Sequence, residues 1–246
     1  MTLVIALNCK DGIVMASDGQ ATVVSSGGPV RVETEKIFKV NDTTLFGASG
    51  NVGNIQKSLE VIKSIKDLEE DWNQTIMSNV KRQLFWIYQD DLKRHVDFYN
   101  TINPNQIPPP PIADVILTKI QENGEKIIWH IAPDCSDELL HDLGYACTGN
   151  GDVFAHTLLR GYEIKNIDIE KGKLLAYNTI KLGIEVGAFG LGEPIYIWAM
   201  KKIDTGIEIK QLSNEEMMAL KDTWLYWRET LREIFEKIQI KNIGDQ

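Results

Sequence analysis

The stretch TLVIALNCKDGIVMASDG, residues 2–19, decides the fold. It opens with an apolar, β-rich run over residues 3–9 and turns at Lys10-Asp11-Gly12. An Asp-Gly pair between two apolar runs is a strong hairpin signal, because glycine accepts the positive φ that tight turns require. A return strand over residues 13–16 follows, and Ser17-Asp18-Gly19 ends it. The chain is therefore predicted to begin with an antiparallel β-hairpin.

Further strands and helices come in separate blocks along the chain. After the first strands, apolar residues recur at helical spacing in two long segments. Strand patterns then return, two more helical segments follow, and further strands precede a last helix. Blocks of strands and helices, rather than strict alternation, indicate an α+β protein. We therefore expect a four-layer αββα sandwich, with two antiparallel sheets between helix pairs. The expected strands are 36–40, 44–48, 115–120, 126–131, 195–200 and 207–210, the expected helices are 51–70, 73–99, 151–163 and 170–186, and 23–29 and 101–111 are expected as a loop and an extended connector.

The last helix has a clear start and an apolar stripe. Ser213 and Glu216 match a capping box, in which each side chain bonds the other residue's backbone N–H. Trp224, Trp227 and Phe235 follow within the helix and would either close over the core or form a docking face. We expect a catalytic domain over residues 1–210 and a C-terminal helical extension over residues 211–246 packed on it.

Composition and charge narrow the class of protein. The 246 residues are 43% hydrophobic and 25% charged, as in ordinary globular domains, and the net charge is −9. An acidic chain is repelled by nucleic acid and by anionic membranes, so neither is expected as a partner. The 3 cysteines form no CxxC pair and the 4 histidines lack metal-site spacing. A cytoplasmic protein without metal or cofactor is expected.

Five short motifs follow one another in the first 53 residues: Thr2, Lys10-Asp11-Gly12, residues 16–22 (ASDGQAT), Glu35-Lys36-Ile37-Phe38 and residues 47–53 (GASGNVG). In their order and spacing they resemble the opening of a proteasome β-subunit. The stretch 17–22 also resembles the peptidase of the bacterial two-component ATP-dependent protease. The resemblance covers the first 60 residues or so strongly, becomes looser through residues 148–151, and does not extend to residues 211–246.

The resemblance implies an N-terminal-nucleophile hydrolase of the threonine peptidase type. Thr2 would become the N-terminus once Met1 is removed, so one residue would carry both the hydroxyl nucleophile and the amine base. Lys36 would lie beside the hydroxyl, and Asp18 would fix the charge and position of Lys36. Gly50 would offer its backbone N–H to the developing oxyanion.

Matching positions also suggest a substrate pocket and two departures from the family pattern. Ala21, Ala48 and Val52 would line the pocket for the residue before the cut, and their size favours a large apolar side chain. Asn150 stands where the family commonly has a serine that supports the amine, and residues 188–192 (AFGLG) replace a common Asp-x-x-Ser-Gly motif. The two-component peptidases also lack that aspartate, so the loss does not exclude activity.

The resemblance further implies a homo-oligomeric ring of six or seven subunits, stacked in pairs, that encloses the active sites. Unfolded protein or peptide would be the substrate, and a ring ATPase would deliver it. Two alternatives stay open: a catalytically silent structural ring subunit, and an amidase or peptide ligase of the same chemistry that acts outside a closed chamber. The size of the assembly distinguishes the amidase or ligase from the two ring-forming candidates, the peptidase and the silent subunit.

Overall fold

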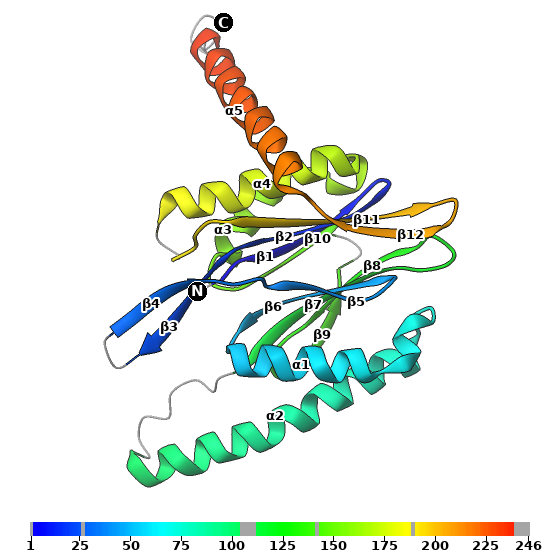
Figure 1. Cartoon of the computed structure of the whole chain (residues 1–246), viewed down its shortest axis with the longest axis vertical. Helices are drawn as coiled ribbons and strands as arrows, with labels where there is room; N and C mark the ends of the chain where they lie inside the picture. Colours follow the sequence, from blue (N-terminus) through cyan, green and yellow to red (C-terminus); the bar gives the residue numbers. More distant parts are fainter. Residues whose placement is uncertain (1, 26–27, 104–111, 141–142, 188–189, 239–246) are drawn as a thin grey trace, which may run out of the picture.

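A computed structural model describes residues 2–25, 28–103, 112–140, 143–187 and 190–238. Two five-stranded antiparallel sheets stack face to face, with α3 and α4 over one outer face and α1 and α2 over the other (Figure 1). The predicted α+β four-layer sandwich is therefore confirmed. The first sheet runs in the order β10 (Tyr145–Thr148), β1 (Val4–Cys9), β2 (Gly12–Asp18), β11 (Ile195–Ile203) and β12 (Gly206–Gln211).

The second sheet covers the other half of the core, and a separate two-stranded ribbon projects from the body beside it. The second sheet runs in the order β5 (Ile37–Asn41), β6 (Thr44–Gly50), β7 (Ala113–Ile120), β8 (Lys126–Ile131) and β9 (Asp137–Leu139), and the ribbon consists of β3 (Gln20–Ser25) and β4 (Gly28–Glu33).

Helices cover the outer faces of both sheets. Asn51, Asn73 and Asp168 cap α1, α2 and α4 by accepting backbone N–H groups of the first turn, which explains where these helices begin. None of the helices among the described residues is long and apolar enough to cross a membrane. The helices are α1 (Val52–Ser64), η1 (Lys66–Glu69), α2 (Gln74–Ile102), α3 (Asp152–Leu159), η2 (Ile164–Asn166), α4 (Ile169–Val186) and α5 (Asn214–Lys237).

Alternation along the strands produces three apolar layers. Ile5 of β1 and Leu3, which directly precedes the strand, face α3 and α4, whereas Val4 and Ala6 face the second sheet. A third cluster fills the space between the second sheet and α1 with α2. Because Thr2 precedes Leu3 and alternates with it, the Thr2 end of β1 lies at the edge of the space between the two sheets.

Several local expectations differ from the structure. Residues 23–29 were expected as a loop, but Val23 pairs with Val30 in the β3–β4 ribbon, because only the tip is rich in serine and glycine. The helix expected over 51–70 ends at Ser64, since Ile65 adopts extended angles before a 3₁₀ turn. The α3 helix is shorter than expected, and β9 and β10 were not predicted at all. Of the connector expected over 101–111, α2 takes the first two residues, and residues 104–111 lie outside the described ones.

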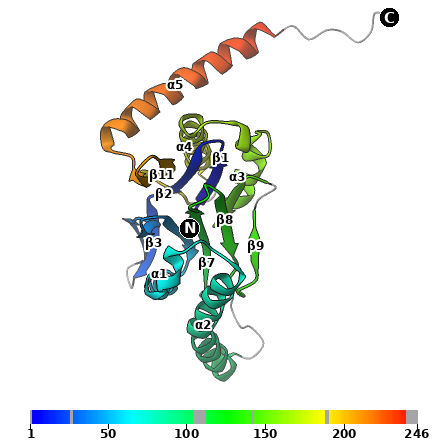
Figure 2. The same ribbon diagram turned by 90° about the vertical axis from the view of Figure 1, so that its right-hand side faces the viewer.

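The terminal helix α5 contacts the body through its residues up to Arg228, which bonds Glu185 on α4, and then projects away (Figure 2). Ser213 and Glu216 form the predicted capping box. Trp224 is its buried residue, donating a hydrogen bond of 2.9 Å to Asn178 Oδ1 on α4 and packing edge-on against Tyr177. Beyond Arg228, the helix leaves the body and its apolar side chains face outward.

Candidate active site

A buried ion pair joins the two sheets at the end of β2. Lys36 Nζ lies 2.5 Å from Asp18 Oδ1 and donates a second hydrogen bond of 2.7 Å to the Gln20 carbonyl oxygen. Asp18 is fully buried and Lys36 is 5% exposed. The same Asp18 oxygen accepts the Leu3 N–H at 2.9 Å, so the carboxylate holds the backbone that follows Thr2. The pair is therefore fixed directly beside the predicted nucleophile.

The remaining oxygen of Asp18 is also satisfied, by two backbone N–H groups. Gln20 donates to Oδ2 at 3.3 Å and Gly192 at 3.2 Å. Buried carboxylates need such donors, because an unsatisfied charge in the interior is costly. With donors on both oxygens, the Asp18 carboxylate has one favoured orientation.

Local sequence explains why the pair forms here. Asp18 is the last residue of β2, and Lys36 directly precedes β5, whose Ile37 pairs with Gly47. Gly19 permits the tight packing beyond Asp18, because a Cβ at this position would lie 2.4 Å from the Pro194 carbonyl oxygen.

Burial lowers the pKa of the Lys36 ammonium, and the attraction and hydrogen bond of Asp18 oppose that shift. The direction follows from charge desolvation, which disfavours the protonated amine. Asp18 favours the ammonium form of Lys36, and a cation in this water-poor site acts on a neighbouring oxygen more strongly than it would in bulk water.

Two glycines with positive φ shape the backbone around Thr2. Gly149 has φ +105°, and a Cβ there would lie 2.2 Å from the Thr2 carbonyl oxygen. Gly50 has φ +112°, and a Cβ there would lie 2.2 Å from the Ile112 carbonyl oxygen. Both positions therefore require glycine for conformation and for space.

A cavity of about 220 Å³ opens at Thr2 and brings most of the predicted site residues together. It is lined by five of the predicted residues and by seven that the sequence interpretation missed, and its floor packs against the apolar cluster under α1. The predicted lining residues are Thr2, Ala21, Lys36, Gly50 and Val52, and the others are Thr22, Thr34, Glu35, Phe38, Ile55, Gln56 and Leu59.

Three predicted residues are not part of the cavity lining: Asp18, which lies behind Lys36, and Ala48 and Asn150. Ala48 is fully buried in the apolar cluster against which Phe38, Ile55 and Leu59 pack, so it lies beneath the cavity. Asn150 is exposed in the turn before α3 and does not line the cavity. Residues 188 and 189, which belong to the stretch that departs from the family's Asp-x-x-Ser-Gly motif, lie outside the described residues.

A polar cluster beside Gly50 was also missed. Ser49 and Thr148 share a hydrogen bond of 2.7 Å between their hydroxyls. Asp114, which pairs in register with Ser49, lies 2.6 Å from His130 Nε2. The hydrogen bond that the Asp114 carboxylate accepts raises the pKa of His130, and burial opposes this shift. Nothing in the local sequence links these residues, since β6, β7 and β8 of one sheet and β10 of the other bring them together.

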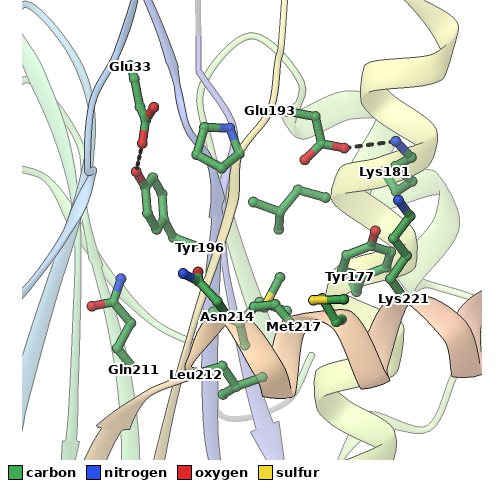
Figure 3. A pocket seen from close by; sticks show the side chains of 14 residues that line it. Glu33, Tyr177, Lys181, Glu193, Tyr196, Gln211, Leu212, Asn214, Met217 and Lys221 are labelled. Atoms are coloured by element: carbon green, nitrogen blue, oxygen red, sulfur yellow. Dashed lines mark hydrogen bonds and ion pairs between the residues drawn. The ribbon is translucent and has the colours of Figure 1, made fainter.

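A larger cavity, of about 700 Å³, lies between β11, α4 and the start of α5 (Figure 3). Its two carboxylates already have partners: Glu193 lies 2.8 Å from Lys181, and Glu33 accepts a hydrogen bond of 2.6 Å from Tyr196. It holds no pairing of a nucleophile with a base, so chemistry rather than size selects the cavity at Thr2.

Comparisons with known proteins agree with the resemblance seen in the sequence. A family model described as "Proteasome subunit" matches residues 2–193. A proteasome subunit beta of Methanococcus aeolicus is 23% identical over 87% of this chain and 92% of that protein. A proteasome subunit beta of Nanoarchaeum equitans is 25% identical over 83% of this chain and 96% of that protein.

A solved structure shows the same fold. The Anbu (Gly-1) mutant from Hyphomicrobium sp. strain MC1 superimposes with a TM-score of 0.68, covering 99% of this chain and 100% of that one. At 14% sequence identity, this likeness concerns the fold alone.

Proposed function

The chain belongs to the proteasome subunit family, and we propose that it is a threonine-type endopeptidase whose nucleophile is the Thr2 hydroxyl once Met1 is removed. The observation that carries the proposal is the single cavity in which Thr2, Lys36 and Gly50 meet, with Asp18 bound behind Lys36. These groups supply a nucleophile, a cation and a backbone donor within one site.

The proposed reaction uses Thr2 twice. Its free α-amine, with an ordinary pKa near 8, takes the proton of its own hydroxyl as the oxygen attacks the substrate carbonyl. The amine then protonates the leaving amine, and a Thr2 ester remains. Water attacks that ester, the α-amine again takes the proton, and the new carboxyl product leaves with the hydroxyl restored.

Lys36 and Gly50 would stabilise charge during these steps. The Lys36 ammonium favours the ionised hydroxyl oxygen and disfavours a permanently protonated α-amine nearby. Asp18 keeps Lys36 charged and in place. The Gly50 N–H would face the oxyanion of the tetrahedral intermediate, and Asn150 is a candidate support for the amine from the turn before α3.

The cavity favours peptides with an apolar side chain before the cut. Phe38, Ile55 and Leu59 give it an apolar wall, and Ala21 and Val52 leave room near Thr2. Glu35 and Gln56 add polar groups to the lining. Unfolded polypeptide, which presents extended segments, is the substrate class that such a cavity admits.

Assembly into a closed ring is part of the proposal. We infer rings of six or seven identical subunits, stacked in pairs, with a ring ATPase feeding substrate and with the cytoplasm as the location. Relatives named as proteasome β-subunits support this assembly. Identical head-to-tail contacts must either close into a ring or run on as a filament. The outward-facing Tyr226 and Phe235 of α5 supply apolar surface for such contacts.

Intact mass, a peptide epoxyketone probe and particle size test the proposal together. We expect loss of Met1, labelling of Thr2 and a ring-sized particle, with no labelling in Thr2→Ala. A processed ring that neither labels nor cleaves peptides would identify a silent structural subunit. A monomer or dimer that cleaves amides would identify a non-compartmental amidase or ligase.

A further inference from the structure

The segment Gly190–Gly192, which follows α4, passes directly beside the Asp18 carboxylate. The Gly192 N–H donates to Asp18 Oδ2 at 3.2 Å, and the Gly192 carbonyl accepts the Gly19 N–H at 3.0 Å. Leu191 is buried in the apolar cluster that also contains Leu3. The segment is therefore tied both to the ion pair and to the core.

The side chain of Gln20 fastens this segment. Gln20 Nε2 donates a hydrogen bond of 3.1 Å to the Gly190 carbonyl oxygen. Its amide also lies against Gly192, since a Cβ on Gly192 would come within 2.1 Å of Gln20 Oε1. One side-chain amide thus contacts both ends of the segment that presents the Gly192 N–H.

The backbone of Gln20 reaches the ion pair from the other side. Its N–H donates to Asp18 Oδ2 at 3.3 Å, and its carbonyl accepts from Lys36 Nζ at 2.7 Å. Gln20 is therefore in contact with Asp18, with Lys36 and with the segment that supplies Asp18 with a further donor.

We propose that Gln20 is a positioning residue for the Asp18–Lys36 pair, and that its side-chain amide aims the Gly192 N–H at Asp18. This role rests on the proposed function of the pair. The side chain acts where residues 188–192 lack the polar groups of the family motif. Because Leu191 anchors the segment in the core by itself, loss of the amide changes the direction of the Gly192 N–H and leaves the fold intact.

Two substitutions separate the hydrogen bond from packing. Gln20→Met keeps the volume and removes the donor, and Gln20→Glu keeps the shape but sets a carboxylate against the Gly190 carbonyl oxygen. Glu193→Gln is the matched control, because it removes only the ion pair with Lys181 one residue beyond the segment. The full-length protein is used throughout.

For both Gln20 variants we expect kcat on an apolar peptide to fall by on the order of 100-fold, as misplacement of a supporting group typically does. KM should stay nearly unchanged, because Gln20 does not line the cavity. Glu193→Gln should retain wild-type kcat and KM.

Hydrogen exchange of the Gly192 amide gives a readout that does not depend on activity. Exchange should accelerate in Gln20→Met and not in Glu193→Gln, while the Leu3 amide stays protected. Wild-type exchange and kcat in Gln20→Met would overturn the proposal. An inactive wild-type protein with accelerated exchange in Gln20→Met would instead reject the peptidase function and leave the positioning contact supported.

Discussion

Two acid–base pairs lie at the Thr2 end of the sandwich, and they differ in burial. Asp18 and Lys36 are almost fully buried and join the two sheets, and the Asp18 carboxylate accepts backbone N–H groups from three segments of the chain. Asp114 and His130 are 27% and 23% exposed and lie on adjacent strands of one sheet. Both pairs have contacts near 2.5 Å, so distance alone does not distinguish them.

The difference in surroundings sets what each pair can do. A buried cation keeps its charge only while its partner stays in place, and it acts strongly on a nearby oxygen. A partly exposed pair is screened by water and contributes little to stability. We therefore expect the first pair to control reaction and folding, and the second to respond to pH with small effects.

The largest expected effect is on catalysis. Lys36→Ala should lower peptide turnover by about four to six powers of ten, as removal of a central catalytic group does. His130→Gln, at the exposed pair, should stay close to the wild-type rate. Turnover of a fluorogenic apolar peptide by both variants measures the contrast. An equal loss of turnover in both variants would show that burial does not determine which pair supports catalysis.

The next effect is on folding stability. Lys36→Met should destabilise the protein by about 3–5 kcal/mol, because Asp18 is left buried without its cation. The double variant Asp18→Asn with Lys36→Met should recover part of this loss, since no uncompensated charge remains. Urea unfolding measures both values. A double variant less stable than Lys36→Met would contradict the view that the unpaired charge is the cause.

Buried and exposed positions should also differ at the cavity beside Thr2. Ala48→Phe should cost about 1–3 kcal/mol, because the residue is fully buried beneath the cavity and has no space to grow. Val52→Phe should leave stability near wild type, since Val52 is 52% exposed, yet it should disfavour large apolar residues before the cut. Thermal unfolding and a cleavage-site profile of each variant compare the two. An unchanged profile in Val52→Phe would place the pocket elsewhere.

The smallest effect is the pH response of His130, which faces Asp114 on β7, Glu138 on β9 and Asp152 on α3. Since its pKa is raised in the folded state, its stabilising contribution is present below the unfolded-state pKa near 6.5 and is lost as pH rises through the folded-state value. The change should be at most about 1 kcal/mol, or about 2–4 °C in Tm. Measurements of Tm from pH 5.5 to 8 test this: the decrease of Tm with rising pH should be smaller in His130→Gln than in the wild type. The same dependence of Tm on pH in both proteins would show that His130 is not its source.

Local sequence predicted the hairpin at Asp11-Gly12, the capping box at Ser213 and the main helices, because short-range hydrogen bonds and apolar periodicity fix such features. It missed β9, whose three residues are all exposed and carry no apolar alternation. It also missed the ribbon formed by β3 and β4, since serine and glycine near its tip outweighed the valine pair Val23 and Val30.

At the candidate site, local motifs identified Thr2, Asp18, Lys36 and Gly50 as candidate catalytic residues, because each belongs to a short contiguous stretch of sequence. The surroundings of these residues follow from the tertiary structure. It placed Phe38 and Ile55 in the cavity wall, moved Ala48 beneath the floor, and brought Gln20 to Gly190 across 170 positions of the chain. Contacts between residues so far apart in the chain depend on how the two sheets and their helices pack together. That packing involves many side chains at once, so no short stretch of sequence predicts it.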